Sequence, residues 1–483
     1  MSAPRRSNST KKEPSQINLH TTNPDYDKQL PKYQLWEDLY SGSTLIEKNA
    51  KYLIQHPWEP LKQYDIRKDR AVYRNFAAPI AHIFSSSIWR KAPDRESFPE
   101  VLKPFIKNVD RNNKAANEFF QEVTERAAAI GIQFVVVDNP KGRPQTQAEA
   151  KRQGIRPYFV LVQPHQLIDW GFDDDGSLSY VVIYEEVETQ SEAFVGHTVE
   201  AQWKLWTKTE WKIYIEQETV KKSGEKKNVA VLKESGTHGI GEVPIAAFYF
   251  RKKTRMVGGS CLRDVDTLCM RIYRRDSELD KMLFDSAITL WFFKGFSADQ
   301  LTEFVMSTSN GLRSDSVEAG VECVEPPGNS FKAITESIDK DERTIREIAL
   351  RMIRPDSRQV ESAESKKLDK QPLDSQLSLF SKNIENGERR CWQLALKWLN
   401  RGGNEELELQ YNRDFDVETI SESLINALLG LRRNQDISRE TLWELLKRGE
   451  ILGDDFNQDE EATRLELEQR SRGRFPDLGK NFL

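Results

Sequence analysis

Residues 258–286 read GGSCLRDVDTLCMRIYRRDSELDKMLFDS, and the apolar positions in this stretch recur at steps of three and four residues. That spacing places them on one face of an amphipathic helix. Residues 331–353 repeat the pattern and carry charged residues on the opposite side. Residues 287–330 lie between the two stretches and contain the helix breaker Pro326-Pro327-Gly328. We predict two long helices joined through a short insert, with apolar surface left over for neighbouring copies of the chain to cover.

Length and composition are those of a folded chain. Its 483 residues are 38% hydrophobic and include 11 Trp and 23 Phe, which suits two to four domains with cores of their own. We find no apolar run of about 18 residues and therefore expect no membrane span. Residues 1–12 are basic and rich in Ser without an apolar core, so we expect a mobile arm there and not a secretion signal. The net charge of −5 argues against a protein that grips the DNA backbone.

The remaining chain predicts an α+β fold. β-Branched and aromatic runs predict strands at residues 132–137, 158–162, 180–185, 201–206, 211–216, 245–250 and 407–411. Apolar periodicity predicts further helices at residues 33–53, 64–90, 117–130, 373–400, 421–432, 438–448 and 459–472. Pro79 should kink or divide the second of these helices, and Gly131 should cap the third. The stretch from Arg354 to Gln371 is almost wholly polar and reads as a loop.

Catalytic motifs are absent from the sequence. It contains no P-loop, no G-x-S-x-G and no H-E-x-x-H. The glycines at 236–241 and the pair Asp454-Asp455 fit turns better than a nucleotide site or a metal site. The four cysteines are scattered and are expected to be buried thiols, and the six histidines are singly placed. We therefore expect no enzyme and no catalytic, cofactor-binding or metal-binding residues.

Four motifs in fixed order carry a resemblance to a known family. They are EKNAKYLIQHPWEPLKQYDIRKDRAVYRNFAAPIAHIFSSSIWRKAP at 47–93, AAAIGIQFVVVDNP followed by RPYFVLVQPHQLIDW at 127–170, GIGEVPIAAFY at 239–249, and DISRETLWELLKRGEILGDDFNQDEEA at 436–462. Together they span most of residues 46–465. In order and spacing the chain resembles the portal proteins of tailed bacteriophages, in particular a portal-like subfamily known as a domain of unknown function.

The resemblance implies a ring, usually of twelve subunits, at one capsid vertex, through which DNA is packaged and later ejected. It divides each subunit into a wing, a two-helix stem, an inserted clip and a mainly helical crown. The implied bounds are an N-terminal arm at 1–32, a wing at 33–258, stem helices at 259–286 and 331–353, a clip at 287–330, a tunnel loop at 354–372, a long helix at 373–403, and a crown with the C-terminal tail at 404–483.

The same resemblance assigns roles to particular residues. The DNA-facing tunnel loop would contain Arg351, Arg354, Arg358, Lys366, Lys367 and Lys370, although a solvated loop of mixed charge fits these residues equally well. The stem interface between copies would contain Leu268, Ile272, Leu279, Ile338, Ile345 and Ile348. The clip would contain Trp291, Phe292, Phe293 and Phe296. Twelve copies would carry a net charge on the order of −60, which keeps the channel from binding its cargo tightly.

The implied partners are about twelve copies of the chain, double-stranded DNA, the terminase large subunit, the head-to-tail adaptor, and the major capsid and scaffolding proteins. The implied location is the portal vertex of the virion, and the host cytoplasm during assembly. Two other classes stay open from the sequence. One is another structural virion component, such as an adaptor or tail protein, and the other is a nucleic-acid enzyme with an unrecognised site.

Overall fold

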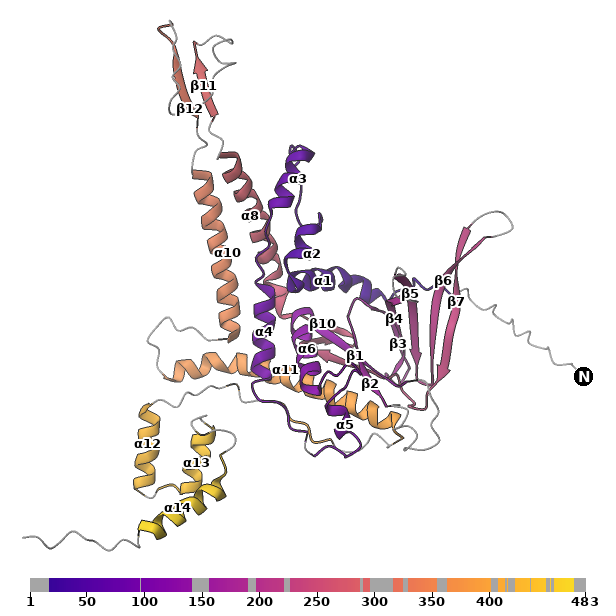
Figure 1. The fold of residues 1–483 in the computed structure, drawn as a ribbon, viewed down its shortest axis with the longest axis vertical. Helices are drawn as coiled ribbons and strands as arrows, with labels where there is room; N and C mark the ends of the chain where they lie inside the picture. Colours follow the sequence, from indigo (N-terminus) through magenta and orange to yellow (C-terminus); the bar gives the residue numbers. More distant parts are fainter. Residues whose placement is uncertain are drawn as a thin grey trace, which may run out of the picture. The chain divides into compact units, whose positions relative to one another are not determined.

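The structure is a computed structural model that divides the chain into two units, Met1–Arg413 and Asp414–Leu483. It describes residues 17–95, 97–140, 156–189, 197–220, 226–286, 290–295, 316–324, 329–353, 363–400, 407–412, 415, 422–434, 436–448, 452 and 456–472. In the first unit a group of helices is followed by antiparallel strands and then by long helices, and the described part of the second unit is helical (Figure 1). The predicted α+β class is confirmed. Among the described residues, no helix is long and apolar enough to cross a membrane.

Helices come first in the described part of the first unit. They are α1 (Pro24–Ser41), α2 (Ser43–Lys48), α3 (Leu61–Arg70), α4 (Ala77–Ile88), α5 (Lys103–Ile106) and α6 (Ala116–Ile130). The helix predicted over residues 64–90 is divided, as one of the two alternatives for Pro79 allowed, but the division lies at residues 71–76 between α3 and α4 and not at Pro79. Pro79 lies in the first turn of α4, where its missing N–H removes no intrahelical hydrogen bond.

A three-stranded antiparallel sheet forms the centre of the first unit. Its order is β2 (Tyr158–Val162), β1 (Ile132–Asp138) and β8 (Ile245–Tyr249). Gly131 ends α6 with φ of 96°, a left-handed conformation that glycine adopts without strain, as predicted. Phe120 of α6 packs against Phe248 of β8 with ring centroids 5.9 Å apart. This aromatic contact ties the helix to the sheet.

A second, five-stranded sheet follows the order of the chain. It contains β3 (Leu167–Phe172), β4 (Leu178–Thr189), β5 (Thr198–Thr207), β6 (Glu210–Val220) and β7 (Lys226–Thr237), all antiparallel to their neighbours. The sequence predicted neither β3 nor β7. Gly171 interrupts the first, and the apolar run of the second, residues 229–232, is short and bounded by Lys, Asn and Glu, so neither stands out as a strand. Two short strands, β9 (Arg251–Thr254) and β10 (Val257–Gly259), come next.

The last part of the first unit contains its long helices. A 3-10 turn, η1 (Cys261–Asp264), leads into α8 (Asp266–Ser286). The strands β11 (Leu290–Lys294) and β12 (Gly320–Val324) pair as an antiparallel hairpin, and α10 (Asn329–Ile353) follows. Then comes α11 (Ala363–Trp398), which packs against β8, β1 and α4.

The predicted boundary between the polar loop and the long helix is wrong. The loop was expected to run through residue 372 and the helix to begin at Leu373, but the helix begins at Ala363. Residues 363–371 are mostly Ala, Glu, Lys, Leu and Gln, which are strong helix formers. They lack an apolar stripe, so periodicity could not reveal them. Residues 354–362 lie outside the described residues.

The predicted strand at 407–411 is also wrong. Leu407, Leu409 and Tyr411 are buried and alternate with exposed neighbours, but the segment forms no strand in the described part of the chain. Side chains of α11 hold its backbone instead. Arg389 donates to the Leu409 carbonyl at 2.9 Å, and Ser381 donates to the Asn412 carbonyl at 2.8 Å.

The described part of the second unit contains α12 (Glu422–Arg433), α13 (Arg439–Arg448) and α14 (Gln458–Arg472), close to the three helices predicted. The Ser438 hydroxyl accepts a hydrogen bond from the Thr441 amide at 3.0 Å, so Ser438 caps α13.

Candidate subunit interface and partner-docking site

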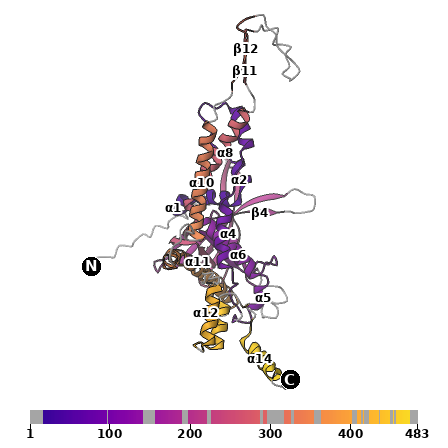
Figure 2. The same ribbon diagram turned by 90° about the vertical axis from the view of Figure 1, so that its left-hand side faces the viewer.

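The predicted stem is an antiparallel pair of long helices, α8 and α10, which we call the helix pair. The two helices lie side by side in both views (Figures 1 and 2). Two hydrogen bonds fix the start of α8. Ser260 caps the preceding turn by accepting from the Leu262 amide at 2.8 Å, and Trp36 of α1 donates to Asp266 at 2.9 Å. The helix pair is therefore anchored at one end to the body of the first unit.

The residues predicted to face other copies divide into two groups. Ile272, Ile338 and Ile345 are only 1%, 4% and 2% exposed in the single chain. The chain itself covers them, which corrects the expectation that a neighbouring subunit must do so. Leu268, Leu279 and Ile348 are half-buried and retain surface that another copy could contact.

A buried carboxylate holds the helix pair together. The side chain of Asp341 on α10 is 5% exposed and accepts hydrogen bonds from two arginines of α8. Nε of Arg271 lies 2.5 Å from Asp341, and Nη1 of Arg275 lies 2.7 Å away. The bond to Asp341 raises the pKa of Arg271. Sequence reasoning missed this clasp, because the charges look like part of a solvated helix face.

A second polar contact joins the helix pair to the linker before α4. Arg74 donates to Asp276 of α8 at 2.8 Å and also bonds Glu342 of α10. Burial raises the pKa of the Asp276 carboxyl above its usual value, against the opposing effect of Arg74. One guanidinium therefore connects three separate segments of the first unit.

Nearer the hairpin, α3 and α8 meet through another arginine. Arg70 donates to the two Asp280 oxygens at 2.7 and 3.2 Å, and its guanidinium lies 4.4 Å from the ring centroid of Phe284. Leu283 and Phe284 remain 51% and 43% exposed. This end of α8 thus combines ion pairs with accessible apolar surface.

The hairpin of β11 and β12 occupies the predicted clip. It pairs Trp291 with Cys323, Phe292 with Glu322 and Phe293 with Val321. Phe292 is 60% exposed, Phe293 is half-buried, and Lys294 bonds Glu322 at 2.8 Å. The Trp291 side chain and the whole of Phe296 lie outside the described residues. Among the described residues of the hairpin, Phe292 is therefore the aromatic side chain with the most surface available for docking a partner protein.

The residues assigned to the tunnel loop are not brought together in the described part of the chain. Arg354 and Arg358 lie in the undescribed range 354–362. Arg351 is in the last turn of α10, and Lys366, Lys367 and Lys370 are in α11, but their side chains are not described. Their contact with DNA stays a prediction.

Three of the four cysteines fit the expectation of buried thiols, and the Cys323 side chain lies outside the described residues. Cys261, Cys269 and Cys391 are free and buried, and burial raises the pKa of each thiol. Within the described ranges, no group of three or more His, Cys, Asp or Glu side chains could hold a metal ion.

Comparisons with known proteins give limited similarity. A family model described as a domain of unknown function (DUF4055) matches residues 262–399, which include the helix pair and most of α11. No curated protein matches the chain. Among solved structures, the neck of a native GTA particle computed with C12 symmetry is similar at 12% identity and a TM-score of 0.38, covering 82% of this chain and 95% of that one. The neck of an empty GTA particle computed with C6 symmetry is similar at 11% identity and a TM-score of 0.38, covering 84% of this chain and 98% of that one.

Proposed function

We propose that this chain is a structural component of the head-to-tail connector of a phage-like particle and, more specifically, its portal protein. In this proposal α8 and α10 form the stem, the β11–β12 hairpin forms the clip, and many copies assemble into a ring around a DNA channel. The resemblance of the ordered sequence motifs to portal proteins supports the portal assignment. It describes a conduit and a docking platform without catalytic chemistry.

The observation that carries the proposal is the construction of the helix pair. Two long antiparallel helices are clasped by the buried Asp341 and connected through a hairpin that exposes Phe292. A rigid pair of this kind suits a channel wall, because its half-buried Leu268, Leu279 and Ile348 can pack between subunits. An exposed aromatic on the connecting hairpin suits a partner-docking end.

The charges on the described part of α10 suit a channel wall that does not bind DNA tightly. The exposed residues of α10 mix acids and bases, including Lys332, Glu336, Asp339 and Lys340. Such a surface gives no continuous basic stripe of the kind that grips phosphates. The net charge of −5 per chain acts in the same direction.

Binding to the terminase large subunit separates a portal from an adaptor or tail protein. The full-length chain would be purified, assembled and mixed with the cognate terminase large subunit, and co-sedimentation of the two would be measured. Assembled rings should capture terminase, and Phe292→Ser should weaken the capture without altering ring size. Rings that bind an adaptor but never terminase would contradict the portal assignment and leave only the broader connector role.

A further inference from the structure

The connection from α2 to α3 displays an apolar surface. Ile54, Trp58 and Leu61 are 61%, 95% and 65% exposed. A single exposed leucine is ordinary, but tryptophan is usually largely buried and is enriched among the residues that dominate interface energies. An almost fully exposed indole, with two exposed aliphatic side chains close to it in the sequence, marks a contact surface. We call residues 54–61 the Trp58 loop.

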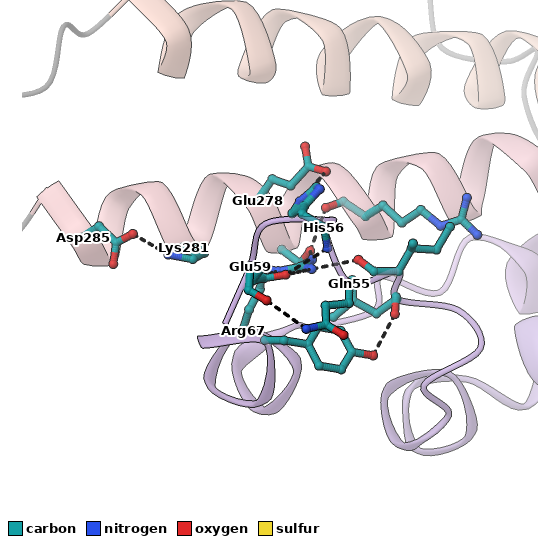
Figure 3. A network of polar contacts seen from close by, with 12 residues as sticks. Gln55, His56, Glu59, Arg67, Glu278, Lys281 and Asp285 are labelled. Carbon is teal, nitrogen blue, oxygen red and sulfur yellow. Dashed lines mark hydrogen bonds and ion pairs between the residues drawn. The ribbon is translucent and has the colours of Figure 1, made fainter. Parts of the chain in front are cut away.

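A buried ion pair holds the Trp58 loop in one conformation. The Arg67 guanidinium of α3 donates to the two Glu59 oxygens at 2.9 and 2.7 Å, and the two side chains are only 2% and 5% exposed (Figure 3). Arg67 also donates to the Ile54 carbonyl at 2.8 Å. The same guanidinium therefore binds the start of the loop and the residue after Trp58.

Further contacts attach the Trp58 loop to α8. Arg67 donates to the Ser277 hydroxyl at 3.1 Å, and His56 lies 3.6 Å from Glu278 (Figure 3). Within the loop, Gln55 donates to the Glu59 carbonyl at 2.9 Å. A buried ion pair adds little net stability because both charges lose their hydration, and it can serve instead to specify one conformation. Here that conformation presents Trp58 outward on a preorganised backbone, which lowers the entropy lost on binding.

The exposed flank of α10 lies on the other side of the helix pair from the Trp58 loop. Figure 1 shows α8 between α3 and α10, and α8 contacts both. On α8, Arg275 bonds Asp341, whereas Ser277 and Glu278 meet the loop. Because the helices are antiparallel, the height of the loop corresponds to the turns of α10 that precede Asp341.

Those turns of α10 combine small side chains with exposed charges of both signs. Ala333 and Ser337 lie four residues apart, one turn of the helix, and the exposed charged residues of the same turns are Lys332, Glu336, Asp339 and Lys340. The Trp58 loop and these turns of α10 therefore lie at matching heights on opposite flanks of the helix pair. A patch whose complement lies on the opposite side of the same molecule makes head-to-tail contacts, which can close into a ring.

We propose that the Trp58 loop docks on the exposed flank of α10, around Ala333 and Ser337, in a second copy of this chain. The inference rests on the proposed ring function and names the contact that would hold neighbouring helix pairs together. Trp58 supplies the apolar anchor, and the small side chains of Ala333 and Ser337 let it approach the α10 backbone.

Replacing Trp58 tests the anchor. The concentration at which the full-length chain assembles would be measured by mass photometry for wild type, Trp58→Ala and the control Leu379→Ala, which truncates an exposed leucine of α11. Trp58→Ala should raise that concentration about 30-fold or more, as expected for an interface hot spot, while the circular dichroism stays unchanged. Equal assembly by wild type and Trp58→Ala would overturn the inference and leave the ring function intact. A wild-type chain that never assembles would refute the ring function itself and this contact with it.

A disulfide trap tests whether the Trp58 loop contacts α10 of a second copy of the chain. In a Cys323→Ser background the remaining cysteines are buried, so Trp58→Cys combined with Ser337→Cys should be the reactive pair. Mild oxidation of the assembled protein should give a ladder of covalent dimers, trimers and higher species. Trp58→Cys with Lys382→Cys, on exposed α11 surface, should give none. Absence of a ladder from the first pair, with Trp58 needed only for binding a different protein, would assign the loop to that protein and overturn the inference.

Discussion

Asp341 shows at the scale of one residue how the helix pair depends on a contact hidden from the sequence. Its carboxylate accepts from Arg271 and Arg275, which are separated from it by about 70 positions. Periodicity assigns residues to helix faces, but it cannot tell which charge on one helix meets which charge on another. The burial of this acid follows from tertiary packing alone.

Removing the Asp341 charge should loosen the helix pair. Asp341→Asn should lower the free energy of unfolding by about 1–2 kcal/mol, a modest value because the two arginines it leaves unpaired can still reach water. Urea titration followed by circular dichroism measures the change. Asp339→Asn, an exposed neighbour on the same helix, should stay within about 0.5 kcal/mol of wild type. Equal effects of the two variants would show that the clasp contributes nothing to stability.

The ion pair between Arg67 and Glu59 should make the stability of the chain depend on pH. The hydrogen bond from Arg67 lowers the pKa of the Glu59 carboxyl below its usual value near 4.5. A depressed pKa gives stability that is present above the unfolded value and is lost as the pH falls through the folded value. Wild type should therefore be more stable than Glu59→Gln at pH 7, and the difference should shrink as the pH falls from about 5 towards 3. Unfolding free energies of the two proteins across this range provide the measurement. A difference that does not change with pH would contradict the pairing.

Among the elements, those with local signals could be predicted. The unit α6–Gly131–β1 follows from apolar periodicity, a glycine cap and a β-branched run, all within 23 residues. The helix pair and the insert between them follow from the same kind of pattern. The start of α11 could not be predicted, because residues 363–371 have helical propensity but no apolar stripe. Residues 407–411 show the alternation of a strand, but sheet pairing depends on a distant partner that the sequence does not reveal.

The candidate site was predictable in outline and not in detail. Apolar spacing indicated which residues of α8 and α10 lie on a packed face. It could not decide whether the chain or a neighbour covers them, and Ile272, Ile338 and Ile345 proved to be covered within the chain. The Trp58 loop carries one sequence signal, a tryptophan between two prolines, whose exposure only the structure shows.

Two isoleucines of α10 should respond differently to a buried charge. Ile345→Asp should unfold the helix pair, because this side chain is 2% exposed. Ile348→Asp should leave the chain folded, since the half-buried charge can reach water, but it should raise the assembly concentration about tenfold. Thermal unfolding and mass photometry separate the two effects, with Glu347→Gln as the exposed control. Normal assembly by Ile348→Asp would exclude this turn of α10 from the subunit interface.

At the scale of the whole molecule, a deletion between α10 and α11 tests whether this segment meets DNA in the channel. Deleting residues 355–362 avoids both helices and should leave the rings intact, whereas packaged DNA should fall about tenfold or more if this segment meets DNA. Quantitative measurement of protected DNA in particles built with the deletion variant gives the result. A control that replaces the same residues with Gly and Ser of equal length separates the chemistry of the segment from its length. Unchanged packaging by both variants would remove the tunnel-loop role.

The central claim is that α8 and α10 of many copies surround a channel. Rotational averaging of electron micrographs of the purified, assembled chain tests it most directly. We predict a ring of about twelve subunits with an axial hole and the helix pairs lining it. A particle without rotational symmetry, or a monodisperse monomer at every concentration, would contradict the account.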